Sequence, residues 1–206
     1  MRSLALADGQ PYHGQTVAVM DESVPAAGPG VYYILSAVVV CDPVKVAGAV
    51  RKVAGERLRP FHYANEGPKI VERMLSLVED EALMATCLWC PTGRRGQIAA
   101  RGGLLREHAQ KCEEVGVDHL IIESGDETTD LRDQAALLDT FREDGDIPYR
   151  YDWRSKAEPL LWIADAASGI AAECLLGRRT DYYQRLEAAG LIEVINVNMR
   201  QPRLPS

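Results

Sequence analysis

Two apolar, β-branched segments lie close together near the start of the chain, and they constrain its fold more than any other feature. Residues 16–23 read TVAVMDES and residues 31–40 read VYYILSAVVV, with a loop rich in proline and glycine between them. Runs of this composition that are bounded by turn-forming residues are typical of strands. The pair predicts an antiparallel hairpin as the first unit of the protein.

The region after the hairpin has the patterns of two helices and a strand. Residues 42–58 begin with Asp-Pro and carry apolar residues at helical spacing in spite of two glycines, and residues 69–81 form a second helical segment after a turn. Residues 82–90, ALMATCLWC, read as a third strand that ends at Pro91. The two helices therefore form an insertion between the second and third strands.

The rest of the chain alternates helices with strands. Alternation at this length indicates crossover connections and a mainly parallel part of the sheet. Helices are expected at 98–115, 129–144, 156–176 and 182–189, and strands at 118–124, 148–153 and 192–199.

The order of these elements predicts the fold class. An antiparallel start of three strands followed by alternating helices and strands is the succession of ribonuclease H-like folds. We expect an α/β protein with a ribonuclease H-like mixed sheet flanked by helices, and with the helical insertion at 42–81 after the first hairpin. The 206 residues suit a single domain with loose ends at 1–15 and 200–206. A fold by itself does not assign a function.

Composition and charge limit the cellular compartment and the binding partners that we expect. The net charge of −7 argues against a protein that coats nucleic acid through bulk electrostatics, because such binding needs a basic face. The longest apolar segment, residues 159–177, contains Asp165 and Glu173 and falls short of the ~20 clean apolar residues of a membrane span. The N-terminus has no signal-peptide pattern, and five cysteines without framework spacing fit a reducing compartment. We expect a cytoplasmic protein without membrane contact.

Two of the predicted strands end in acidic residues. Side chains alternate along a strand, so Val17, Val19 and Asp21 share one face. The same counting puts Ile121 and Glu123 on one face of the later strand. Each of these apolar strands therefore finishes in a carboxylate that continues its row of buried side chains.

A third acid lies on the long helix predicted at 156–176. Asp165 has apolar or small residues at the neighbouring helical positions, among them Trp162 and Gly169. A charge in such surroundings must be paired or bound to a cation. Asp21, Glu123 and Asp165 together form a natural oxygen site for Mg²⁺ or Mn²⁺. Each acid alone is explained as readily by a helix cap or by a partner arginine.

Four motifs stand out along the chain: MDES at 20–23, FHYANE at 61–66, IIESGD at 121–126 and SKAEPLLWIADAASGIAAE at 155–173. Together they resemble the DUF3800 family of bacterial proteins. The resemblance implies a ribonuclease H-like fold and a metal-dependent nuclease whose substrate is DNA or RNA. It also implies two metal ions about 4 Å apart that clamp the scissile phosphate.

The resemblance assigns roles to individual residues. Asp21, Glu123 and Asp165 match the family's acids and would be catalytic metal ligands. Asp126 is an alternative metal ligand, because the pattern on the later strand is mixed among relatives. Further residues in the matching motifs, for catalysis or for holding the substrate, are Glu22, Ser23, His62 and Lys156.

Two features of the sequence beyond these motifs bear on the site. The segment TGRRGQIAARGG at 92–103 contains Arg94, Arg95 and Arg101 and is the best candidate for gripping a phosphate, although such residues usually form solvated surface. Glu127 is a further acid near the site, as a ligand or a proton acceptor.

Two other functions compete with the nuclease. One is a catalytically inactive ribonuclease H-like module that acts through a protein partner or as a homo-oligomer, which the acidic net charge favours somewhat. The other is a phosphatase-type enzyme that uses the same carboxylates on a small substrate. Cys87-x-x-Cys90 does not predict a zinc site, because positions i and i+3 of a strand face opposite sides. Neither G-x-x-x-x-G-K-[ST] nor G-x-G-x-x-G occurs in the sequence.

Overall fold

The computed structural model describes residues 12, 14–55, 59–143 and 145–197. Residues 200–206 and most of 1–15, which the sequence predicts to be loose ends, lie outside these ranges. Within the described ranges, no helix combines the length and the apolar character that crossing a membrane requires.

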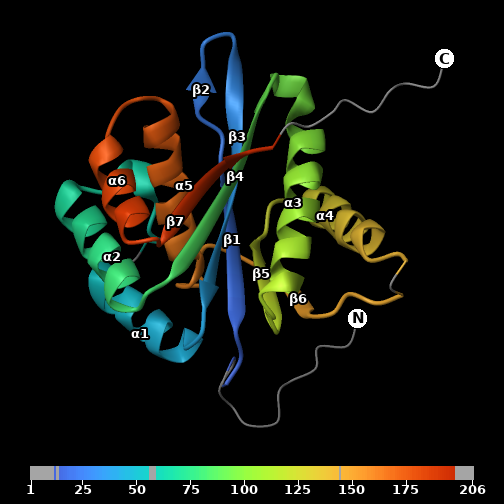
Figure 1. Ribbon diagram of the computed structural model, residues 1–206, viewed down its shortest axis with the longest axis horizontal. Coiled ribbons are helices and arrows are strands. Elements are labelled where there is room, and N and C mark those ends of the chain that lie inside the picture. Colours follow the sequence, from blue (N-terminus) through green and yellow to red (C-terminus); the bar gives the residue numbers. More distant parts are fainter. Residues whose placement is uncertain (1–11, 13, 56–58, 144, 198–206) are drawn as a thin grey trace.

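A single mixed sheet forms the centre of the protein, with the strand order β6-β5-β1-β3-β4-β7 and with β2 paired to β3 (Figure 1). The strands β1, β3 and β4 are antiparallel neighbours, whereas β1, β5 and β6 run parallel. The predicted hairpin and the parallel region are thereby confirmed. The strands are β1 (Val17–Ser23), β2 (Ala26–Ala27), β3 (Gly30–Val40), β4 (Met84–Thr92), β5 (His119–Glu123), β6 (Arg150–Arg154) and β7 (Ile192–Asn196).

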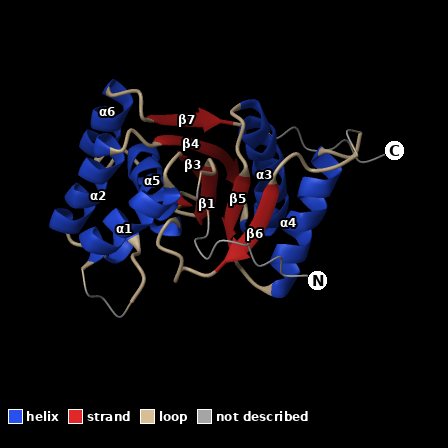
Figure 2. Cartoon of the chain, turned by 90° about the horizontal axis from the view of Figure 1, so that it is seen from below, coloured by secondary structure: helices blue, strands red, loops and turns tan. Residues whose placement is uncertain are grey.

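Helices cover both faces of the sheet. One layer contains the inserted helices α1 and α2 together with α5 and α6, and the other contains α3 and α4 (Figures 1 and 2). The helices are α1 (Pro43–Ala54), α2 (Pro68–Asp80), α3 (Gln97–Glu114), α4 (Glu127–Thr140), α5 (Leu161–Leu175) and α6 (Thr180–Ala188), with short 3₁₀ turns η1 (Tyr63–Asn65) and η2 (Arg94–Gly96).

The alternation of side chains along the strands divides the core into two halves. Val17 and Val19 of β1 pack in the half that contains α5, whereas Ala18 and Met20 pack in the half that contains α3 and α4. The cysteine pair divides in the same way, with Cys87 in the first half and Cys90 in the second. The strand pattern of the sequence therefore determines which side chains face which helix layer.

Three of the element boundaries that differ from the sequence prediction involve a proline or a glycine. The long helix begins at Leu161, five residues after Lys156, and Pro159 disfavours an extension of the helix back through Glu158. Strand β4 continues past Pro91, since β7 pairs with β4 only up to Trp89 and requires no N–H from the proline. Helix α1 ends at Ala54, where Gly55 has a φ of 72°, and residues 56–58 lie outside the described ranges.

His108 gives the protein a specific sensitivity to acid. Its side chain is buried in the α3 and α4 half of the core, and Nε2 donates a hydrogen bond to the Leu35 carbonyl at 2.8 Å. Burial lowers the pKa of His108 from its ordinary 6.5 to about 4. His108 therefore binds a proton near pH 6.5 in the unfolded chain but only near pH 4 in the folded protein. The free energy of unfolding falls through this range as the pH falls.

We expect His108 to account for about 2 kcal/mol of the unfolding free energy lost between pH 7 and pH 5. Urea denaturation at both pH values measures this loss. The variant His108→Gln keeps an N–H donor but does not titrate, so its loss should be smaller by that amount. An equal loss in the wild type and the variant would show that His108 does not govern the acid response.

Candidate active site

Strand β1 carries two neighbouring carboxylates just before its last residue, and they face opposite sides of the sheet. Asp21 follows Val17 and Val19 on the α5 side and is 1% exposed. Glu22 follows Ala18 and Met20 toward α3. The two acids therefore belong to different surroundings although they are neighbours in the chain.

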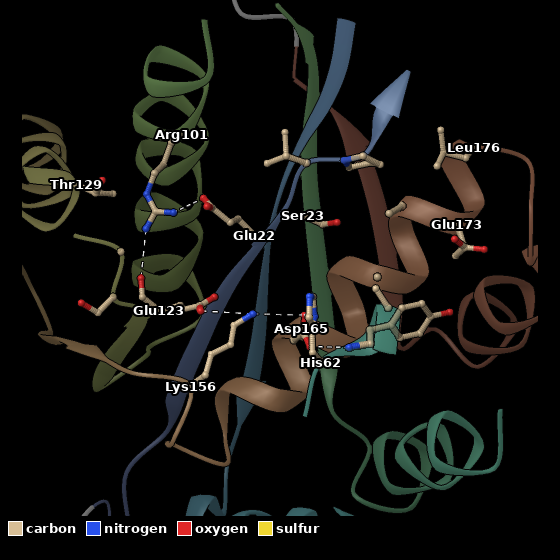
Figure 3. Close-up of a pocket in the computed structure, with 18 of the residues that line it drawn as sticks. Glu22, Ser23, His62, Arg101, Glu123, Thr129, Lys156, Asp165, Glu173 and Leu176 are labelled. Carbon is tan, nitrogen blue, oxygen red and sulfur yellow. Dashed lines mark hydrogen bonds and ion pairs between the residues drawn. The ribbon is translucent and has the colours of Figure 1, made fainter. Parts of the chain in front are cut away.

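The predicted acids Asp21, Glu123 and Asp165 come together around one lysine. The Lys156 ammonium lies 3.7 Å from an Asp21 oxygen, 3.4 Å from a Glu123 oxygen and 3.9 Å from an Asp165 oxygen. Figure 3 shows Lys156 between Glu123 and Asp165. The acids reach this point from β1, β5 and α5, and none of the three is paired with an arginine through an ion pair in the described residues.

Sheet register explains why two of the acids meet. Met20 of β1 pairs in parallel with Ile122 of β5, so Asp21 and Glu123 are each the next residue along their strands. Ile121 packs in the α5 half of the core, and Glu123 lies on that same face by alternation. The two strands therefore end alike, and their carboxylates lie on the same face of the sheet.

Asp21 is electrostatically the most perturbed of the acids. One oxygen accepts a hydrogen bond from the Glu22 N–H at 2.7 Å, whereas Oδ2 is buried and has no hydrogen-bond partner among the described residues. Burial, followed by the adjacent Glu123 carboxyl and the charge of Asp165, raises the pKa of Asp21 to about 10, with Lys156 opposing the rise. The nearby Lys156 ammonium therefore does not offset burial and the neighbouring acids, and the charged form of Asp21 is disfavoured.

Asp165 is held by the inserted region. His62 Nδ1 lies 3.3 Å from one Asp165 oxygen, and the backbone N–H of Tyr63 donates to the other at 2.8 Å. The His62 side chain is 49% exposed, so it can also meet a ligand in the pocket. The insertion between β3 and β4 therefore positions Asp165. The sequence did not predict that Tyr63 contributes to this.

Lys156 is fixed by the backbone of its loop. Its carbonyl accepts a hydrogen bond from the Trp162 indole N–H at 2.7 Å. Burial lowers the pKa of Lys156, but the charges of Asp21, Asp165 and Glu123 outweigh it and raise the pKa overall. Lys156 is therefore a charged partner of all three acids.

Gly169 lets the inserted region approach α5. A Cβ at this position would lie 2.3 Å from Cγ and Cδ1 of Tyr63 and 2.8 Å from its Cβ. These atoms are at the base of the tyrosine side chain, so a clash can be relieved only by moving η1. Such a movement would carry away the Tyr63 N–H that binds Asp165.

We expect Gly169→Ala to lower the free energy of unfolding by about 1–3 kcal/mol through overpacking. The matched control is Gly48→Ala in α1, where the added Cβ meets no atom within 4 Å. That substitution should raise the free energy of unfolding by about 0.5–1 kcal/mol, as alanine does in an open helical position. Urea denaturation of both variants tests the contact, and a stabilised Gly169→Ala would contradict it.

Glu22 belongs to a separate ion network. The Arg101 guanidinium contacts Glu22 and donates to both oxygens of the buried Asp133, at 3.0 and 2.7 Å. The Tyr33 hydroxyl also donates to Glu22, and burial together with the charge of Glu22 raises the pKa of that hydroxyl. Glu22 lines the pocket but is occupied by Arg101 and Tyr33, so the structure does not bring it to the three acids.

The other predicted residues divide between the pocket and the surface. Ser23 lies at the end of β1 and lines the pocket. Arg94 and Arg95 are exposed in η2 and are not among the pocket's lining residues, so their assignment to substrate binding stays a prediction. Asp126 caps α4 by accepting the Thr129 N–H at 2.7 Å, and hydrogen bonding from the side chain and the backbone of Thr129 lowers the pKa of Asp126. The structure therefore gives Asp126 a capping role and does not bring it to the three acids, and its assignment as a metal ligand stays a prediction.

A pocket of about 740 Å³ opens over the acids. Glu22, Arg101 and the start of α4 form one wall, and η1 and α5 form the other (Figure 3). Sequence reasoning missed Asp133 and the contact of Tyr63 with Gly169. The only signals were an acid at a helical position and a tyrosine next to His62, which are too common to single out.

Comparison with known proteins identifies a similar fold. A solved structure of the complex of PCNA and RNase HII from Archaeoglobus fulgidus matches with a TM-score of 0.50, covering 92% of this chain and 98% of that chain. The fold is ribonuclease H-like. The identity is 13%, so the likeness concerns the fold alone. No family model and no curated protein matches the chain, and membership of DUF3800 therefore stays a prediction.

The acids on this ribonuclease H-like scaffold suit a divalent cation. Within the described residues, no three His, Cys, Asp or Glu side chains are arranged closely enough to hold a metal ion as they stand. However, Asp21, Glu123 and Asp165 already converge on one cationic group, and the buried Asp21 Oδ2 lacks a hydrogen-bond partner. Carboxylate oxygens are the ligands that Mg²⁺ and Mn²⁺ prefer, so the donor set fits such an ion.

Proposed function

We propose that this protein is a divalent-metal-dependent nuclease that hydrolyses phosphodiester bonds in DNA or RNA. The observation that carries the proposal is the convergence of Asp21, Glu123 and Asp165 on a single positive charge in the pocket. The ribonuclease H-like fold and its likeness to a structure containing RNase HII support the same reaction class.

The three acids would hold Mg²⁺ or Mn²⁺. Bound there, the ion supplies activated water and stabilises charge on the phosphate oxygens. His62 and the Tyr63 N–H keep Asp165 oriented toward the other acids. Ser23 and Lys156 line the pocket and offer polar contacts to the substrate.

The pocket favours a substrate that arrives with its own counter-ions. Both arginines in its lining are already paired with carboxylates, Arg101 with Glu22 and Asp133 and Arg178 with Glu173. A phosphate group would be repelled by the bare carboxylates, so we expect the divalent ion to be required for substrate binding as well as for hydrolysis.

The test is cleavage of end-labelled DNA and RNA, single- and double-stranded, in Mg²⁺, in Mn²⁺ and in EDTA. The proposal predicts cleavage that needs the metal and stops on chelation. Hydrolysis of a small phosphate monoester without cleavage of nucleic acid would instead support the phosphatase-type enzyme. Mn²⁺ binding without any hydrolysis would support the inactive binding module.

A further inference from the structure

The Lys156 ammonium occupies the position in which a metal ion would meet all three acids. It is the one group within 4.0 Å of Asp21, Glu123 and Asp165 alike among the described ion pairs. The separations of 3.4–3.9 Å exceed the ~2.7–2.9 Å of a strong charge-assisted hydrogen bond. Lys156 is therefore shared among the acids and bound tightly to none of them.

The lysine can leave the acids without disturbing the fold. Its backbone is anchored by the Trp162 indole, whereas its side chain is 31% exposed at the pocket. Four methylene groups separate the ammonium from that anchor, so rotation about side-chain bonds moves the charge into the open pocket. The backbone of the loop need not move.

A divalent cation and the ammonium cannot share this position. Both would contact the same three carboxylates, and two positive charges a few Å apart repel each other strongly at a site that is only partly exposed to water. Without either cation, the three carboxylates would face one another, with Asp21 fully buried. A cation at this position therefore lowers the repulsion among the acids, and only one of the two cations fits there at a time.

We propose that Lys156 is an internal counter-cation that exchanges with the divalent metal ion: it neutralises the acids in the metal-free protein and swings away when the ion binds. This inference rests on the proposed function for its metal ion. The exchange keeps the acids gathered before the ion arrives and weakens the affinity for it. The displaced ammonium stays tethered in the pocket, where a substrate phosphate would enter.

The test is titration of the whole protein with Mn²⁺ alone, by calorimetry and by the electron paramagnetic resonance signal of free Mn²⁺. Lys156→Met removes the competing charge at similar side-chain length. We expect it to bind Mn²⁺ at least about tenfold more tightly than the wild type, since a unit charge at this distance outweighs that factor even after screening. The matched control is Lys45→Met, which removes an exposed lysine paired with Glu81 and should leave the affinity unchanged.

Urea denaturation in EDTA gives a second readout. The metal-free Lys156→Met protein should be less stable than the wild type, and saturating Mn²⁺ should stabilise it by more than it stabilises the wild type. Lys156→Gln is assessed in the same way if the methionine variant does not fold.

Two results would overturn the exchange, and they differ in what else they remove. Mn²⁺ binding that is equal or weaker in Lys156→Met removes the exchange and leaves the nuclease proposal in place. A lack of Mn²⁺ binding in both the wild type and the variant removes the metal site, and the nuclease proposal and the exchange are lost together.

Discussion

Replacing Asp21 with asparagine is expected to abolish metal-dependent cleavage and, at the same time, to stabilise the metal-free protein. Asparagine keeps the shape of the side chain but removes the charge that the ion needs. The rate should fall by at least about a hundred- to a thousandfold, the loss that follows removal of a group that stabilises charge in a transition state. Cleavage of labelled nucleic acid in Mn²⁺ measures it.

The stability gain follows from the raised pKa of Asp21. The ordinary value is 3.8 and the folded value is about 10, so between these values the folded protein retains a proton that the unfolded chain releases. Stability from this group is therefore complete below about pH 4 and is lost as the pH rises toward 10. In EDTA at pH 7, Asp21→Asn should be more stable than the wild type by several kcal/mol, and the difference should widen as the pH rises toward 10.

Asp126→Asn is the matched control for this variant. Asn caps a helix as well as Asp does, so α4 should be unaffected. The exposed Asp126 side chain lies outside the pocket lining, and cleavage should continue at the wild-type rate. Full cleavage by Asp21→Asn, or a loss by Asp126→Asn, would show that the site is composed differently.

The second large effect is expected for Arg101→Met. Arg101 is 9% exposed, and its guanidinium joins α3 to Asp133 of α4 and to Glu22 of β1. Removing it leaves a buried carboxylate without its cation, which costs about 3–5 kcal/mol when one member of a buried pair is deleted. The free energy of unfolding from urea denaturation should fall by this amount.

Arg106→Met tests whether the effect comes from burial. Arg106 also joins α3 to α4, through Asp139 at 3.5 Å, but both of these side chains are about half exposed. Exposed ion pairs contribute about 0–1 kcal/mol, so this variant should be nearly as stable as the wild type. Similar losses in the two variants would mean that the network around Arg101 does not hold the helices in place.

Much of the candidate site was already determined by backbone geometry that the sequence reveals. A strand directs every second side chain to the same face, so Asp21 follows the buried valines and Glu123 follows Ile121 wherever those strands lie. A helix directs Asp165 to the side of its small neighbours in the same way. These local repeats predicted the shared acid site and the ribonuclease H-like order of elements.

Only the tertiary structure decided which charges meet. The sequence contains more arginines and lysines than the pocket uses, and no local repeat distinguishes Lys156, which lies among the acids, from Arg94, which lies at the surface. Likewise, the pairing of Asp133 with Arg101 and the approach of Tyr63 to Asp165 join residues 32 and 102 positions apart. Periodicity determines the direction of a side chain within its own element, whereas the distance between elements depends on how the whole core packs.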